Sequence, residues 1–177
     1  ETWPAQPGSF DLVVSATAFH WIAPEVGYPK AAALLNERGY LAIFSNEHRP
    51  PAPDFAADLY QIEQRLVPWW PDPRTPPDLD AAIAETAAAI NATGLFAPVM
   101  VKTYPWTQSY TTPIYLRLIN TYSNYRNLDE HTRTQLFQAI GELLDKRYAG
   151  VITKSYLAVL YLAQKASSAS AGSAVPA

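Results

Sequence analysis

The 177-residue sequence predicts an α/β protein built on a partly parallel sheet. The run from Phe10 to Ser15 is apolar and bounded by turn-forming residues, which is typical of a strand in a parallel sheet with both faces covered. A helical pattern begins at Pro24, and a second apolar run follows at 40–45. These elements form a strand-helix-strand crossover, which predicts that the two strands pair in parallel.

The helix of this crossover is predicted to start at Pro24, because a proline in the first turn has no N–H to leave unpaired. Apolar side chains then recur at helical spacing, at Val26, Ala31, Leu34 and Leu35. Gly39 is expected to close the unit before the strand at 40–45.

A proline-rich loop then interrupts the sheet pattern and predicts an insertion at about 47–78. Apolar residues recur at helical spacing from Phe55 to Leu66, so the insertion contains a helix that ends before the next proline. Trp69 and Trp70 follow it among further prolines. We expect this stiff aromatic corner to cover another surface.

The chain then returns to the sheet. An alanine-rich stretch at 80–91 predicts a helix, and the alternating residues 99–103 predict a strand that runs on towards 106. A second insertion is expected at about 107–148. Thr112 and Pro113 are predicted to cap and start its first helix.

The end of the chain contains two different patterns. A helix at about 130–148 is followed by a strand at 151–162 that is rich in β-branched and aromatic residues. The last segment, 166–177, is nearly all Ala, Ser and Gly. Because it cannot bury enough apolar area to offset its ordering entropy, we predict a disordered tail there.

Composition limits the possible partners. The net charge of −3 gives no electrostatic reason to expect nucleic acid or an anionic membrane as partner. The absence of cysteine excludes disulfides and thiolate metal sites. No apolar run approaches the length of a membrane span, so a cytoplasmic protein is the default expectation.

The sequence FDLVVSATAFHWI at 10–22, the following helix with Gly39, and the strand YLAIFS at 40–45 resemble the fourth strand, following helix and fifth strand of class I S-adenosylmethionine-dependent methyltransferases. Within that family the chain looks most like the trans-aconitate methyltransferase-like, or type 11, group. The likeness extends more weakly to 151–156. It implies a partial Rossmann-like methyltransferase sheet over 1–165, made of the carboxyl-terminal strands, with the two insertions as helical caps.

The resemblance also implies a function, which is methyl transfer from S-adenosylmethionine to a small-molecule acceptor, with a carboxylic acid as one candidate. It places the cofactor beside the strand exit, at Ser15, Ala16, Phe19, His20 and Trp21. In open α/β sheets, ligands bind outside the carboxyl ends of the strands, where this segment would lie. Aromatic rings there would favour the positively charged sulfonium.

His20 is the candidate catalytic residue, since an imidazole has an ordinary pKa near 6.5 and can act as a general base. The alternative is a structural histidine at a strand exit. Methyl transfer to a carboxylate also depends on positioning rather than on proton removal. The three histidines are far apart and form no paired-ligand motif, so no metal site is expected.

The acceptor pocket has aromatic candidates, each of which could instead be a core residue: Trp69, Trp70, Trp106, Tyr115, Tyr122 and Tyr156. Arg117 or Arg126 could hold an acceptor carboxylate as a bidentate partner. The alternative is that both arginines are solvated helix residues.

The sequence also departs from the family pattern. No two of its seven glycines form a G-x-G, although the family holds the cofactor with a glycine-rich loop after its first strand. We therefore expect the carboxyl-terminal half of a methyltransferase, inactive by itself. The alternative is a non-catalytic fragment or interaction subunit, completed by an N-terminal half or by a second copy. Such a partner would cover the open side of the strand at 11–15, because an unpaired edge favours strand addition.

Overall fold

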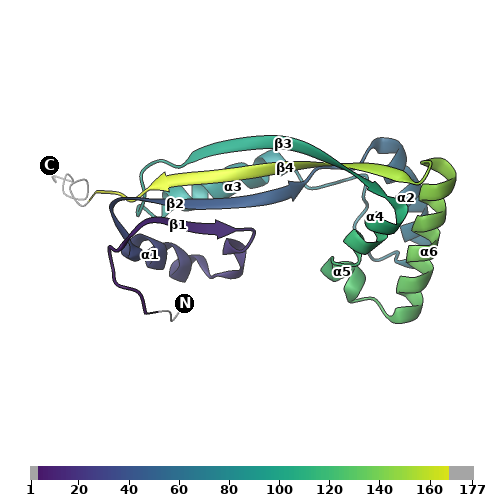
Figure 1. The fold of residues 1–177 in the computed structure, drawn as a ribbon, viewed down its shortest axis with the longest axis horizontal. Helices are drawn as coiled ribbons and strands as arrows, with labels where there is room; N and C mark the ends of the chain where they lie inside the picture. Colours follow the sequence, from purple (N-terminus) through teal and green to yellow (C-terminus); the bar gives the residue numbers. More distant parts are fainter. Residues whose placement is uncertain (1–3, 168–177) are drawn as a thin grey trace. The chain divides into compact units, whose positions relative to one another are not determined.

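The computed structural model describes residues 4–167, which form two compact units. The first unit contains the residues up to Glu47, then Asp78–Tyr104, and the chain from Leu157 onwards. The second contains His48–Pro77 and Pro105–Tyr156. Figure 1 shows the order of the helices and strands along the chain.

Four strands form one open sheet in the order β1-β2-β4-β3. The sheet contains β1 (Phe10–Ala16), β2 (Leu35–His48), β3 (Met100–Thr111) and β4 (Val151–Gln164). β1 and β2 are parallel, which confirms the pairing predicted from the crossover. The β4 arrow in Figure 1 points opposite to the arrows of β2 and β3, and β3 lies at the sheet edge.

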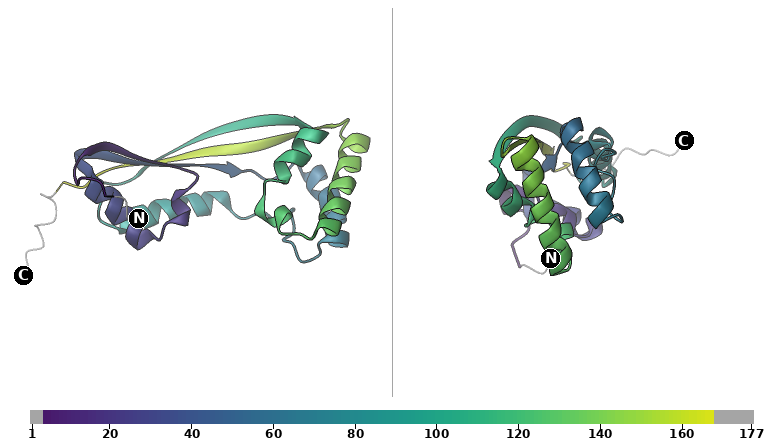
Figure 2. Two further views of the ribbon diagram at one scale, coloured as in Figure 1. Left: turned by 60° about the horizontal axis from the view of Figure 1, so that its bottom comes forward. Right: turned by 90° about the vertical axis from the view of Figure 1, so that its right-hand side faces the viewer.

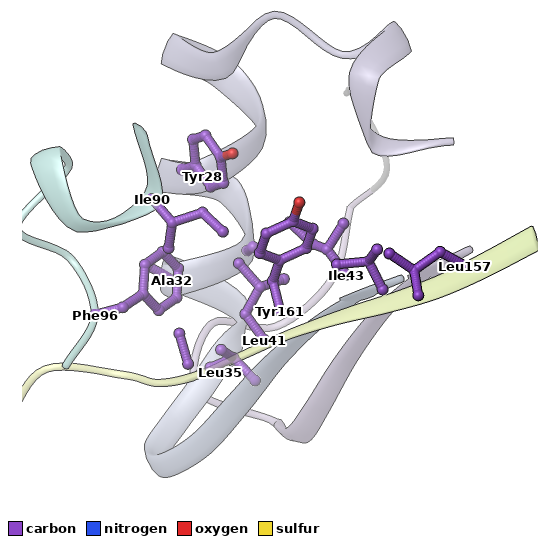
Figure 3. Close-up of a cluster of buried hydrophobic side chains, with 12 residues drawn as sticks. Tyr28, Ala32, Leu35, Leu41, Ile43, Ile90, Phe96, Leu157 and Tyr161 are labelled. Carbon is purple, nitrogen blue, oxygen red and sulfur yellow. The ribbon is translucent and has the colours of Figure 1, made fainter. Parts of the chain in front are cut away.

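The first unit has its core on one face of the sheet. Helices α1 (Pro24–Leu34) and α3 (Leu79–Ala92) lie on the same side of it (Figure 2, left). Their side chains pack against alternate residues of the strands in one cluster, part of which Figure 3 shows: Tyr28, Ala32, Leu35, Leu41, Ile43, Ile90, Phe96, Leu157 and Tyr161. Val13 of β1 packs against this cluster.

The opposite face of β1 and β2 is not covered by the described residues. Leu12 is 49% exposed and Val14 is 52% exposed, while Tyr40 and Phe44 of β2 are also exposed. The expectation of a sheet buried on both faces was therefore wrong for β1. The apolar run of β1 places apolar side chains on both faces of the sheet, but α1 and α3 cover only the face that contains Val13.

The start of β2 also differs from the prediction. α1 ends at Leu34 and β2 begins at once with Leu35, so Gly39 lies within the strand and does not end the helix. The pairing register between β1 and β2 shifts at this point. A Cβ at Gly39 would lie 3.0 Å from the Phe10 carbonyl oxygen and 2.9 Å from the Leu35 side chain. Gly39 therefore permits a close approach of two backbones.

The second unit is mainly helical. It contains α2 (Pro53–Leu66), α4 (Thr112–Ile119), α5 (Ser123–Arg126) and α6 (Glu130–Arg147). Its core is formed by large apolar residues from these helices and from β4: Phe55, Leu59, Val67, Tyr115, Ile119, Tyr125, Leu136, Ile140, Leu144 and Ile152. Asp58 of α2 pairs with Arg147 and accepts a 2.7 Å hydrogen bond from the Tyr148 hydroxyl, which ties α2 to the end of α6.

The first turn of α4 corrects a predicted cap. The N-cap residue is Thr111, and Thr112 lies inside the helix. The buried Thr112 hydroxyl instead donates a 2.6 Å hydrogen bond to Asp145 of α6, while its N–H donates to the Gly150 carbonyl at 2.9 Å. The side chain thus holds α4 against α6, because a carboxylate is a stronger acceptor than a helix-end carbonyl.

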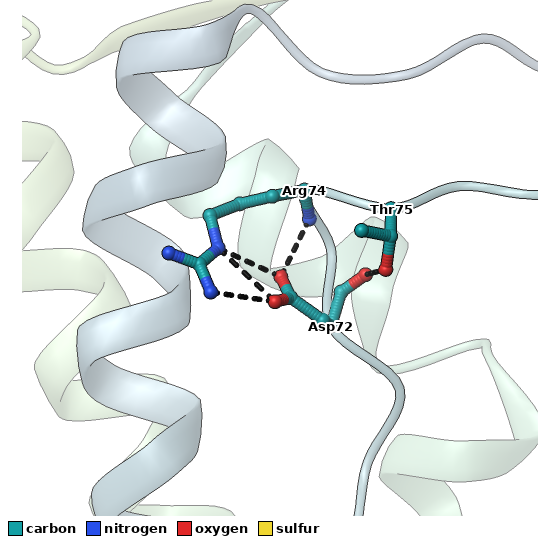
Figure 4. A network of polar contacts seen from close by, with 3 residues as sticks. All are labelled: Asp72, Arg74 and Thr75. Atoms are coloured by element: carbon teal, nitrogen blue, oxygen red, sulfur yellow. Dashed lines mark hydrogen bonds and ion pairs between the residues drawn. The ribbon is translucent and has the colours of Figure 1, made fainter.

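The loop after α2 folds back onto that helix. Arg74 donates to both Asp72 carboxylate oxygens, with an Nη2 to Oδ2 distance of 2.6 Å (Figure 4). Its guanidinium also lies 3.5 Å from the centre of the Tyr60 ring of α2. Together with the prolines, these contacts fix the course of the loop.

The predicted tail at 166–177 starts within the described residues. The Ala166 N–H donates to the Leu95 carbonyl at 2.9 Å, whereas 168–177 lie outside the described residues.

We predict that Gly39→Ala lowers the free energy of unfolding by about 1 to 3 kcal/mol, because the added methyl group meets backbone and a core side chain. Gly141→Ala is the matched control. Its Cβ would make an ordinary 3.4 Å contact with Leu116 in the middle of α6, so stability should stay the same or rise by up to about 1 kcal/mol. Urea unfolding of both variants tests this. Equal losses would contradict the close approach at Gly39.

Candidate ligand sites

The exit of β1 is a tight reversal that leads into a short 3-10 helix, Phe19–Trp21. Thr17 has a positive φ of 48°, an uncommon conformation for a residue other than glycine. Its N–H donates to the Phe44 carbonyl of β2 at 2.8 Å. This bond ties the exit of β1 to Phe44, four residues before β2 ends at His48, and places the reversal beside the carboxyl-terminal part of β2.

A cavity of about 350 Å³ lies at this exit. Its walls come from the β1 exit, α1, the end of β2, α3 and β4: Thr17, Ala18, Phe19, His20, Tyr28, Ile43, Phe44, Ser45, Glu47, Glu85, Thr86, Ala89 and Tyr161. All of these residues belong to the first unit. We call this the strand-end cavity.

The strand-end cavity is acidic and aromatic. Glu47 and Glu85 line it, and none of the described residues in its walls is a lysine or arginine. The rings of Phe19 and Tyr28 pack at 4.8 Å. Burial raises the pKa of Tyr161. A hydrogen bond with Thr86 lowers this pKa, and the negative charge of Glu47 raises it further. The chemistry of these walls suits a cation.

The structure brings together some of the predicted cofactor residues. Phe19 and His20 line the strand-end cavity, whereas Ser15 lines a separate apolar hollow of about 190 Å³ beside α1. Ala16 is the last residue of β1. Trp21 is 82% exposed and lies outside the cavity walls, with its ring 4.9 Å from that of His20.

Sequence reasoning missed the two glutamates and Tyr161. Glu47 could have been found, since it stands at the carboxyl end of the second parallel strand and the rule applied to β1 holds there too. Glu85 and Tyr161 carry no local signal, because α3 and β4 reach the cavity only in the folded sheet.

A second cavity, of about 460 Å³, lies within the second unit. Its walls come from the loop after β2, from α2 and the loop that follows it, from α4, α5 and β4: His48, Arg49, Pro50, Pro51, Ala52, Phe55, Leu59, Pro73, Pro76, Pro77, Tyr115, Ile119, Tyr122, Asn124, Tyr125, Ile152, Thr153, Lys154 and Ser155. We call this the cap cavity.

Lys154 is the half-buried cation of the cap cavity. Its ammonium nitrogen lies 5.9, 5.6 and 5.8 Å from the ring centres of Tyr115, Tyr122 and Tyr156. Burial lowers its pKa from the ordinary lysine value. Among the described residues in the cavity walls there is no aspartate or glutamate.

The predicted acceptor aromatics divide into two groups. Tyr115 and Tyr122 line the cap cavity. Tyr156 and Trp106 stack at 4.4 Å, and the Tyr156 hydroxyl is 2.9 Å from that of Tyr110. Tyr156 therefore reaches the site through its contact with Lys154.

The remaining predicted residues lie away from the walls of the cap cavity. Trp70 packs edge-on against Tyr125 at 4.8 Å, and Trp69 is 67% exposed. Arg117 and Arg126 are exposed. Sequence reasoning missed Lys154, although it stands two residues from both Ile152 and Tyr156, a spacing that puts all three side chains on one face of a strand.

Glu63 is a buried acid in the core of the second unit. The residue is only 7% exposed, and burial, with a smaller contribution from Asp72, raises its pKa from 4.5 to about 7. The described residues contain no cluster of three or more potential metal ligands. None of the described helices combines the length and apolar character needed to cross a membrane.

Comparison with known proteins identifies the fold. No protein-family model matches the chain, and no curated protein sequence matches it. A protein from Anabaena variabilis, described as a methyltransferase of an antibiotic biosynthesis pathway, is 13% identical with a TM-score of 0.51, over 90% of this chain and 69% of that one. A protein from Anaeromyxobacter dehalogenans, described as a type II methyltransferase, is 14% identical with a TM-score of 0.52, over 91% and 66%.

The chain therefore spans about two thirds of the length of these two proteins. At such identities the likeness defines the fold alone. It is a mixed α/β fold with an open four-stranded sheet, matching the Rossmann-like sheet of structures described as methyltransferases.

Glu63 generates a pH prediction. Because its pKa is about 7 in the fold and 4.5 ordinarily, the folded state holds the proton more tightly between these values. The free energy of unfolding should fall as pH rises through this window, by up to about 3 kcal/mol for this group. Glu63→Gln should remove that loss. The stability of the variant relative to the wild type, measured as the free energy of unfolding, should therefore rise between pH 4 and pH 8.

Glu142→Gln is the control. Glu142 is exposed, and hydrogen bonds from Lys146 and Gln138 lower its pKa, so this variant should show no gain at high pH. Urea unfolding at both pH values measures the effect. A pH-independent difference between Glu63→Gln and the wild type would contradict the buried, proton-binding carboxyl.

Proposed function

We propose that this chain is part of an enzyme that transfers a methyl group from S-adenosylmethionine to a small-molecule acceptor. The observation that carries the proposal is the strand-end cavity, which combines aromatic rings with Glu47 and Glu85 at the carboxyl ends of β1 and β2. A sulfonium is a cation, and both carboxylates and aromatic faces attract it. The fold shared with proteins described as methyltransferases supports the same reading.

We propose a carboxylic acid as the acceptor class. The cofactor would supply a methyl carbon bound to a positively charged sulfur. An acceptor carboxylate oxygen would bond to that carbon as the carbon–sulfur bond breaks, and the electron pair of the broken bond would neutralise the sulfur. No proton is removed in this step. His20 therefore serves as a wall of the cavity and needs no general-base role.

The 177 residues contain no G-x-G loop, so the walls of the strand-end cavity are the chain's own contribution to the cofactor site. We expect dissociation constants weaker than about 1 mM. Millimolar S-adenosylmethionine should shift the amide resonances of 17–20 and 44–47 in a titration followed by NMR. Micromolar affinity, or shifts confined to other segments, would overturn this assignment.

The charge of the site has its own test. Glu47→Gln combined with Glu85→Gln should weaken S-adenosylmethionine binding by about fivefold, which is roughly the 1 kcal/mol of a solvated charge pair. Binding of the neutral product S-adenosylhomocysteine should stay unchanged. Glu25→Gln with Glu37→Gln, which changes the same net charge outside the cavity walls, is the control. Equal weakening of both ligands would contradict a sulfonium site.

A second candidate function is supported by the exposed side of β1. Among the described residues β1 pairs only with β2, which makes it an edge strand of the sheet, and Leu12 and Val14 on its uncovered face are half exposed. We propose that this edge receives a further strand from a polypeptide segment that completes the sheet. The chain would then be a module that requires this partner, with or without catalysis of its own.

Without that segment the chain should self-associate through β1, because uncovered edges pair with one another. Leu12→Lys with Val14→Lys should reduce the association without lowering the melting temperature, since both side chains point away from the core. Ile114→Lys, an exposed apolar position of the second unit, should change nothing. Light scattering over a range of concentrations measures this. A wild type that stays monomeric throughout would contradict the proposal.

A further inference from the structure

Lys154 of the cap cavity has no counterion among the residues that the structure describes. Lys154 projects from β4 towards three tyrosine rings, at 5.6 to 5.9 Å from their centres. Among the described residues, no carboxylate lies within 4.0 Å of its ammonium group. The ion pairs that these residues form involve other lysines and arginines. Buried charges in proteins are normally paired.

The surrounding tyrosines cannot provide the missing negative charge. Burial raises the pKa of Tyr115 and Tyr156, and it raises the pKa of Tyr122 to about 12. All three are therefore neutral at physiological pH. Their rings stabilise the ammonium through their faces but leave its charge uncompensated.

The other walls of the cavity combine apolar surface with the polar residues His48, Arg49, Asn124, Thr153 and Ser155. Phe55, Leu59, Ile119 and Ile152 contribute side chains, and prolines contribute further surface. Arg49 is exposed and adds a second positive charge to the lining. The volume of about 460 Å³ is within the range of cavities that enclose a small molecule.

We infer that the cap cavity binds a small monoacid with an apolar or aromatic body, and that Lys154 holds its carboxylate. Lys154 is the cation that faces the three tyrosine rings, and one carboxylate is enough to compensate its charge. An amine would be repelled by Lys154 and Arg49. Arg117 and Arg126, the arginines expected from the sequence, lie outside the walls.

The identity of this acid as a methyl acceptor rests on the proposed function, but its binding does not. Calorimetric titration of the 177-residue chain with 2-naphthoate and with 2-naphthamide isolates the charge, since the two probes share one ring system. The wild type should bind the acid at least tenfold more tightly than the amide.

Lys154→Met should abolish that preference, because it weakens the binding of the acid and leaves the affinity for the amide unchanged. Lys102→Met, at an exposed lysine of β3 in the first unit, is the charge-matched control and should behave as the wild type. Melting temperatures establish that each variant is folded. Should Lys154→Met fail to fold, Lys154→Arg, which keeps the charge, should retain the preference for the acid.

Equal affinity of the wild type for both probes, no binding of either, or an unchanged preference in folded Lys154→Met would each overturn the inference. The cofactor titration at the strand-end cavity separates it from the proposed function. If the chain prefers the acid probe but S-adenosylmethionine does not shift the amide resonances of 17–20, the proposed methyl transfer is wrong and the acid site stands. If S-adenosylmethionine shifts these resonances but the chain does not prefer the acid probe, only the acid site is wrong.

Discussion

The parallel pairing of β1 with β2 is the constraint on which the first unit depends. It brings two strand exits, at Thr17 and at the end of β2, to the same edge of the sheet, where the Thr17 N–H bonds to the Phe44 carbonyl. The pairing requires Gly39, because a side chain there would collide with the β1 backbone. The strand-end cavity exists because both exits open at this one edge.

The two cavities have opposite chemistry, and the described walls of each come from a single unit. The strand-end cavity is lined by glutamates and rings, which suits a cation. The cap cavity is lined by Lys154, Arg49 and rings, which suits an anion. The proposed methyl transfer from a sulfonium to a carboxylate would use one ligand of each charge.

Much of the fold was predictable because its signals are local. Proline at the start of α1 and the apolar run of β1 determine their elements, and the crossover determines the parallel pairing. Other features depend on the assembled sheet. A glycine after a helix can either end that helix or allow two backbones to approach closely. Only the pairing register of β1 against β2 shows that Gly39 allows a close approach.

The sites were less predictable than the fold. Phe19 and His20 follow directly from the strand exit, but Glu85 and Tyr161 enter from α3 and β4, whose sequences do not indicate which side chains face a cavity. Lys154 shares a strand face with Ile152 and Tyr156, but the sequence does not show that Tyr115 and Tyr122 also face it.

A crystal structure of the chain soaked with millimolar S-adenosylhomocysteine tests whether the strand-end cavity holds the cofactor. We expect electron density for the nucleoside in this cavity, against Phe19 and Tyr161. Density in the cap cavity alone, or none at the strand ends in crystals where that cavity is open to solvent, would contradict it.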